Sequence, residues 1–225
     1  MLPPVLVRRL VLAPLVIVIA GALAALTPAV AVLNAAYDLV RRRTSPGHVR
    51  RSRALRVLCL ALAWSAGETA ALTALLGLWI ASGFGGRLDT EPYQARHYGV
   101  MRWFLDLVYR VAQRACGLHV EVTGPPDAQA AVDRPLIVLS RHAGPGDSVL
   151  LIHHLLSVCE RRPRVVMKAT LQLDPSLDIV ANRVPNAFIR RAKSVGVRRS
   201  ARVRTEQVSR LASGLGRHDA LVLFP

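Results

Sequence analysis

Two long apolar stretches dominate the first third of the chain. Residues 10–36 contain no charged side chain, and residues 54–84 are nearly as apolar, with Arg56 near their start and Glu68 in their middle. Each stretch is long enough for a helix that crosses the roughly 30 Å hydrocarbon core of a bilayer. The pattern predicts that residues 1–84 form a membrane-anchoring helical hairpin.

Beyond a glycine-rich break at residues 83–86, short apolar runs alternate with longer amphipathic ones. The short runs predict strands, and the runs with an apolar residue every three or four positions predict helices. Expected strands cover residues 119–122, 136–139, 164–168, 187–191 and 220–223, and expected helices cover residues 98–116, 148–159 and 200–212. Because strands alternate with helices, residues 85–225 are predicted to form an α/β domain.

The strand expected at residues 136–139 leads into a polar turn with candidate chemistry. His142 follows the strand, and Asp147 stands five positions later, where the next helix begins. Open α/β sheets place their ligands at the carboxyl ends of strands, beside helix N-termini. An imidazole there can act as a general base when a carboxylate fixes its tautomer. His142 and Asp147 are therefore the candidate catalytic pair.

Two glycines, Gly144 and Gly146, lie between these residues. They allow a sharp backbone turn and leave room for a substrate, and the N–H groups at a helix start favour a developing negative charge. In the plainer alternative, Asp147 or Ser148 only caps the helix, and His142 is a solvated loop residue.

The composition favours a membrane-associated protein with anionic partners. The chain of 225 residues is 52% hydrophobic, its mean hydropathy is +0.33, and its formal net charge is +16. Such a charge suits phospholipid headgroups or phosphorylated substrates. No nucleic-acid motif or aromatic series accompanies the basic residues, so no nucleic-acid partner is expected. The three cysteines lack the spacing of a metal site or a disulfide framework, which fits a reducing cytoplasm.

The polar turn also resembles a motif of a known family. His142 and Asp147, with four residues between them, resemble the first motif of the glycerolipid acyltransferases, the family of the lysophosphatidate acyltransferases. Arg141 stands where many members carry asparagine. Lys168 and Pro175 loosely match a lysine and a proline that are common in the family.

Two later segments extend the resemblance. Phe188, Ile189 and Arg191 resemble the second motif, Gly-x-x-Phe-Ile-x-Arg, although Pro185 stands where the family has glycine. Residues 224–225 match the Phe-Pro that opens the third motif, Phe-Pro-Glu-Gly. Because the sequence stops within that motif, we expect the acyltransferase domain, residues 85–225, to be incomplete at its C-terminus.

The resemblance implies a glycerol-3-phosphate acyltransferase-like mixed sheet flanked by helices, and an O-acyltransferase of phospholipid biosynthesis. The enzyme would move a fatty acyl group from acyl-CoA or acyl carrier protein to the hydroxyl of a lysophospholipid, with 1-acyl-glycerol-3-phosphate as the favoured acceptor. His142 would take the hydroxyl proton, and Asp147 would orient His142. The implied substrate contacts are Arg191, which would clamp the phosphate, and Arg190, Lys168, Gly144 and Gly146. No metal and no bound cofactor is implied.

Two other functions remain open at this stage. One is a related acyltransferase that uses another lipid acceptor. The other is a non-catalytic, basic protein that binds anionic membrane lipids.

Arginines between the two apolar stretches bear on the orientation in the membrane. They stand at positions 41, 42, 43, 50, 51, 53 and 56. The positive-inside rule predicts a cytoplasmic loop, so two full spans would leave the domain outside, away from a cytosolic acyl donor. Either the hairpin is re-entrant, or the loop is external despite its charge, or both segments are core helices of a soluble protein. The family resemblance favours a re-entrant hairpin at the cell membrane with the domain facing the cytoplasm.

Overall fold

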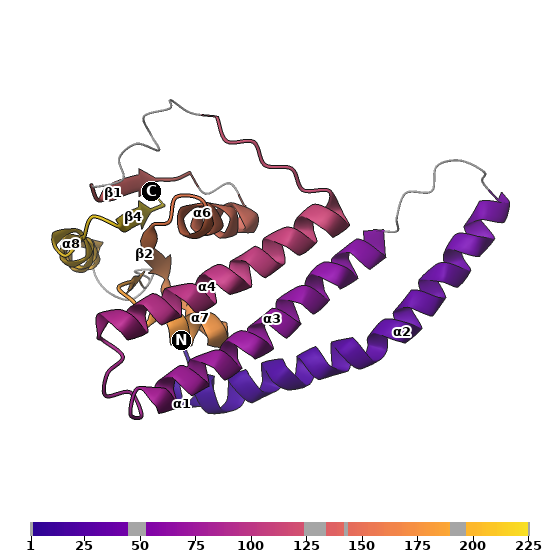
Figure 1. The fold of residues 1–225 in the computed structure, drawn as a ribbon, viewed down its shortest axis with the longest axis horizontal. Coiled ribbons are helices and arrows are strands. Elements are labelled where there is room, and N and C mark those ends of the chain that lie inside the picture. The colour runs from indigo at the N-terminus through magenta and orange to yellow at the C-terminus, as the bar shows by residue number, and fades with distance from the viewer. Residues whose placement is uncertain (1, 45–52, 124–133, 142–143, 190–196, 225) are drawn as a thin grey trace.

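The computed structural model describes residues 2–44, 53–123, 134–141, 144–189 and 197–224. A long helical hairpin at the N-terminus is followed by a third long helix and then by a small parallel sheet with helices on both faces (Figure 1).

The N-terminal apolar stretch forms one continuous helix in three parts. Helix α1 (Val5–Val7) and a π-helical turn (Arg8–Leu12) lead into α2 (Ala13–Thr44). Helix α2 contains Pro28 and bends along its length (Figure 1). A proline inside a helix removes one backbone hydrogen bond, which is the ordinary cause of such a bend.

Two further helices pack beside it. Helix α3 (Arg53–Ala81) lies between α2 and α4 (Glu91–Val111), and α4 continues through a π-helical turn (Ala112–Cys116). Helix α4 begins seven residues before the start that the apolar pattern predicts. The physical reason is its first turn, where Thr90 stands at the N-cap and Pro92 follows Glu91, a favourable helix start that lies ahead of the apolar face.

Two segments of the structure are long and apolar enough to cross a membrane. They are Val5–Tyr37, which contains an 18-residue window with a mean hydropathy of 2.6, and α3, which contains one with a mean hydropathy of 1.4. Side chains of the first segment lie almost entirely outside the protein core. Both findings rest on length and composition, and they indicate membrane association of the N-terminal region.

The sheet contains four parallel strands in the order β1-β4-β2-β3. The strands are β1 (Leu136–Leu139), β2 (Arg162–Lys168), β3 (Ala187–Ile189) and β4 (Asp219–Leu223). The helices between them are α6 (Pro145–Ser157), α7 (Pro175–Ala181), which a 3₁₀ turn (Ala169–Leu173) precedes, and α8 (Val197–Ser213). Because all four strands are parallel, their carboxyl ends lie along one edge of the sheet.

Helices cover the two faces of the sheet. On one face, Leu155 of α6 packs with Val165 and Val222, and Ala220 is fully buried beside them. On the other face, Leu211 of α8 packs against Ala187 and Leu221. Helix α4 lies outside α6, where Tyr98 contacts Leu156 and Val184. The core therefore runs from the sheet through α6 to α4.

The α/β class is confirmed, with two corrections. The strands of the described residues are all parallel, whereas a mixed sheet was expected. Residues 119–122 form no strand, although their apolar and polar residues alternate. Val120 is 38% exposed and Val122 is 62% exposed, so the apolar side of this segment is not buried and the alternation has no packing to favour a strand.

Candidate active site

The first candidate site element is the connection from β1 to α6. Strand β1 pairs with β4, and the pairing extends past its end because the Ser140 N–H donates to the Leu223 carbonyl at 3.0 Å. Helix α6 begins at Pro145. The strand and the helix that the sequence predicts on either side of the polar turn are therefore confirmed. His142, in the middle of this turn, lies outside the described residues.

Asp147 holds the start of α6. Its Oδ2 accepts a hydrogen bond of 2.6 Å from the backbone N–H of Gly144, the N-cap residue. The carboxylate is half-buried in the first helical turn, where the positive end of the helix dipole stabilises negative charge. Asp147 therefore caps the helix from its third position, by accepting from the N-cap residue. The structural alternative expected from the sequence placed Asp147 at the N-cap itself. Its pairing with His142 stays a prediction.

The two glycines of the turn have open space beside them. Gly144 is extended, with φ −160° and ψ 169°, and neither glycine has a positive φ, so neither needs the left-handed conformation that favours glycine. A Cβ atom added at Gly144 or Gly146 would meet no heavy atom within 4 Å. The room that was predicted beside the helix start is present.

Lys168 lies on the same edge of the sheet, at an inner strand. It is the last residue of β2, its side chain is exposed, and it stands opposite Ile189 of β3. Phe188 pairs in register with Met167. Phe188 and Ile189 of the second motif therefore lie on β3, beside Lys168, and the next two residues, Arg190 and Arg191, lie outside the described residues.

The ends of β1 and β3 are separated by two strands. At about 4.8 Å per strand, roughly 14 Å lie between the carboxyl end of β1, which leads to His142, and that of β3, which leads to Arg191. Lys168 ends one of the intervening strands, and Phe224 follows the other. A ligand that reaches from one outer strand to the other must cross these two positions.

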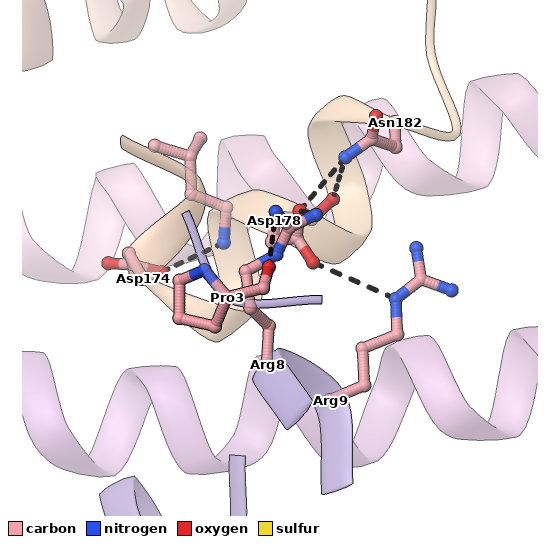
Figure 2. Close-up of polar contacts among 7 residues, drawn as sticks. Pro3, Arg8, Arg9, Asp174, Asp178 and Asn182 are labelled. Carbon is pink, nitrogen blue, oxygen red and sulfur yellow. Dashed lines mark hydrogen bonds and ion pairs between the residues drawn. The ribbon is translucent and has the colours of Figure 1, made fainter. Parts of the chain in front are cut away.

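A buried ion pair joins the N-terminal helix to the sheet domain (Figure 2). Arg8 Nη2 lies 2.9 Å from Asp178 Oδ1, and the two side chains are 7% and 0% exposed. Arg9 Nε lies 3.7 Å from the other carboxylate oxygen, and the Asn182 side-chain amide donates to Oδ1 at 3.1 Å (Figure 2). Asp178 belongs to α7, between β2 and β3, so the junction fixes the connection between two strands of the candidate site.

A second buried contact ties the end of α7 to α3 and α4. Arg183 donates to the carbonyl of Leu75 at 2.7 Å, and it lies 3.3 Å from Nε2 of the fully buried His97. Nδ1 of His97 lies 2.6 Å from the carbonyl of Tyr93, which can only accept, so Nδ1 carries the proton and Nε2 accepts from Arg183. Burial, with Arg183 adding to it, lowers the pKa of His97.

Sequence reasoning missed these contacts and one more. His153 of α6 lies 2.9 Å from Asp106 of α4, and its ring stacks on Tyr109 with centroids 4.2 Å apart. The His153–Asp106 contact joins α6 to α4, two helices that pack against each other. Nothing in the sequence joins Arg8 to Asp178 or His153 to Asp106, because the partners lie 170 and 47 positions apart.

Comparison with known proteins places the sheet domain in a family. The Acyltransferase family model matches residues 119–225, a range that contains the whole sheet, the β1–α6 turn and Lys168. No curated protein and no solved structure gives a significant match. Residues 119–225 therefore form an acyltransferase domain of the glycerolipid acyltransferase family, and this match supports an acyltransferase that acts on lipids.

Proposed function

We propose that this enzyme transfers a fatty acyl group from acyl-CoA or acyl carrier protein to the free hydroxyl of a lysophospholipid. The favoured acceptor is 1-acyl-glycerol-3-phosphate, and the product is a diacyl phospholipid precursor of phospholipid biosynthesis. The observation that carries the proposal is Asp147, a half-buried carboxylate at the start of α6, beside the carboxyl end of β1 in a family-matched domain.

In the proposed mechanism, His142 is the general base. Its imidazole takes the proton of the acceptor hydroxyl as the oxygen attacks the thioester carbonyl. Asp147 orients His142 and stabilises the imidazolium that forms. A carboxylate has two oxygens with about four lone-pair sites, so its bond to the Gly144 N–H is compatible with this role.

The tetrahedral intermediate collapses when the thioester C–S bond breaks. The thiolate leaves as the thiol after it receives the proton that His142 holds, so no charge or proton is left over. Backbone N–H groups around Gly146 stabilise the oxyanion at the positive end of α6, since the Gly144 N–H already donates to Asp147. The open space beside both glycines supports this placement. The step uses no metal and no bound cofactor, since the acyl donor is a co-substrate.

Arg191 is the proposed clamp for the acceptor phosphate, with Arg190 and Lys168 as auxiliary cations. A guanidinium matches a phosphate with two parallel hydrogen bonds, which a lysine ammonium cannot do. Lys168 supports the assignment because it is exposed at the end of an inner strand, between the outer strands that lead to His142 and Arg191.

An acceptor panel with the purified full chain tests the proposal. Lysophosphatidate, lysophosphatidylcholine, monoacylglycerol and a lyso-ornithine lipid are each offered with labelled acyl-CoA and with acyl carrier protein. We expect lysophosphatidate to give the highest kcat/KM. The kcat/KM for monoacylglycerol, which lacks the phosphate, should be lower by at least about tenfold. Transfer to another acceptor in preference would assign that lipid as the substrate. Membrane binding without transfer to any of them would favour a non-catalytic membrane protein.

A further inference from the structure

An open apolar groove runs between α3 and α4. It has a volume of about 670 Å³, within the range of about 300–1,000 Å³ that ligand sites in proteins occupy. Helix α3 and helix α4 line it together, with the following residues: Ala70, Ala74, Gly77, Leu78, Ala81, Arg96, Gly99, Val100 and Trp103.

The groove exists because the two helices present small residues to each other there. A Cβ atom added at Gly77 of α3 or at Gly99 of α4 would meet no heavy atom within 4 Å. Further along the same pair, an added Cβ at Gly67 would lie 3.0 Å from the Phe104 ring. The helices are thus packed tightly at one end of their contact and leave unfilled space at the other.

The lining is apolar except at one end, where it is cationic. The helices are antiparallel, since the Tyr93 hydroxyl donates to the Ala81 carbonyl while Gly67 meets Phe104, so Ala81 lies at the same end as Arg96. The Arg96 guanidinium stacks on the Tyr93 ring at 5.0 Å.

Arg87 adds a second cation at that end, since its guanidinium lies 5.7 Å from the centre of the Tyr93 ring. Within the described part of the chain, neither Arg87 nor Arg96 has a carboxylate within salt-bridge distance. The end of the groove therefore suits an anionic group.

The length of the groove matches one lipid chain. From Ala70 to Ala81, α3 rises about 16 Å at 1.5 Å per residue, and one leaflet contributes about half of the roughly 30 Å hydrocarbon core. Helix α3 is also one of the two segments that are long and apolar enough for a membrane. A diacyl lipid that stands beside α3 can lay one acyl chain in the groove and reach Arg96 with its phosphate.

We propose that the α3–α4 groove binds one anionic diacyl phospholipid of the surrounding membrane, with an acyl chain along Gly77 and Gly99 and the phosphate on Arg96. This site is separate from the candidate active site. Leu75 and His97 face α7 and its following loop, whereas Gly77, Gly99 and Trp103 are exposed on the outer side of the helix pair.

Native mass spectrometry of the full chain in nanodiscs of phosphatidylcholine with a minor fraction of phosphatidylglycerol tests the proposal. The groove is filled with Gly77→Leu and Gly99→Leu, whose Cβ atoms have open space and which raise helix propensity. The matched control is Gly21→Leu in α2, where an added Cβ also has open space. We expect wild type and Gly21→Leu to retain one phosphatidylglycerol and both groove variants to lose at least about tenfold in occupancy.

The charge is tested separately. Arg96→Gln should reduce the preference for phosphatidylglycerol over phosphatidylcholine by about tenfold, whereas Arg110→Gln on the same helix should leave it unchanged. A photoactivatable phosphatidylglycerol with the reactive group on its acyl chain should label peptides that contain residues 70–81 and 96–103.

Two results would overturn the proposal. One is equal retention of phosphatidylglycerol by the groove variants, the wild type and Gly21→Leu. The other is displacement of the labelled lipid by lysophosphatidate but not by excess phosphatidylglycerol, which would make the groove an acceptor site. Retention is measured without acyl transfer, so its failure is distinct from a failure of the proposed reaction.

Discussion

Asp147 combines two tasks that a substitution can separate. An asparagine at this position can still accept the hydrogen bond from the Gly144 N–H, but it carries no charge to orient and stabilise an imidazolium. We therefore expect Asp147→Asn to lower kcat by at least about a hundredfold while changing the free energy of unfolding by less than ~1 kcal/mol. Acyl-transfer kinetics and thermal unfolding measure the two effects. Wild-type kcat in Asp147→Asn would leave Asp147 with the capping role alone.

His97 makes the stability of the protein depend on pH. Burial lowers its pKa in the folded state, so between that pKa and the ordinary value near 6.5 the unfolded chain binds more protons than the folded one. Its contribution to stability is complete above pH 6.5 and is lost as the pH falls below that value. We expect Tm to drop between pH 7.5 and about 5.5, and to drop less in His97→Gln. An equal drop in both proteins would exclude His97 as the cause.

At the scale of elements, the junction between the N-terminal helix and α7 is a strong structural contact. Asp178 is fully buried against Arg8, so Asp178→Ala leaves a buried guanidinium without its partner. We expect a loss of about 3–5 kcal/mol in the free energy of unfolding. The double variant Arg8→Met, Asp178→Leu should recover most of it, since two apolar side chains replace the pair. Denaturant unfolding measures both changes.

The control for this prediction is an exposed ion pair of the same type. Arg202 and Glu206 of α8 lie 3.2 Å apart, with side chains that are 84% and 57% exposed. Solvent screens such a pair, so Glu206→Ala should cost less than ~0.5 kcal/mol. A comparably small loss in Asp178→Ala would contradict a structural role for the junction.

The elements that the sequence predicts well are those with a local signal. The apolar run 136–139, the polar turn after it and the amphipathic run beyond correspond to β1, the turn and α6, because strand and helix periods differ along the chain. The segment 119–122 shows the limit. Its alternation is local, but a strand also needs a neighbour and a buried face, and Val122 has neither within the described residues.

The residues of the candidate site and of the contacts around it also differ in whether a local pattern could predict them. Asp147 and Lys168 could be predicted because each follows or opens an element with a clear pattern. The hydrogen bond between Asp147 and Gly144 joins residues only three positions apart, and the sequence already offered Asp147 as a helix cap. Asp178 could not be found, because a lone aspartate in a short helix has no signal until Arg8 is brought to it from the far end of the chain.

At the scale of the whole molecule, the Arg8–Asp178 junction determines which end of the hairpin lies beside the sheet domain. Arg8 contacts α7, and α3 leads directly into α4, so both ends of the hairpin lie beside the sheet domain (Figure 1). The last turn of α2 and the first turn of α3, which flank the arginine-rich segment, lie at the opposite end (Figure 1). Spanning helices would put this segment across the membrane from the domain, whereas a re-entrant hairpin would keep both on the cytoplasmic side.

We predict the re-entrant arrangement, because the positive-inside rule retains the arginines in the cytoplasm and a cytosolic acyl donor requires the domain there as well. Thiol labelling from each side of sealed vesicles measures it. A variant whose only thiol is Val158→Cys, an exposed position at the end of α6, reports the domain, and a second variant with only Gly47→Cys reports the loop. Both should react from the cytoplasmic side. Reaction of the two thiols from opposite sides would establish a spanning hairpin.

The most direct test of the central claim is acyl transfer by the purified full chain from labelled acyl-CoA to lysophosphatidate, with and without His142. We expect His142→Ala to abolish transfer, because no other group in the proposed mechanism takes the hydroxyl proton. The control His154→Ala, on the neighbouring helix α6, should keep near wild-type turnover. Transfer that persists in His142→Ala would contradict the account.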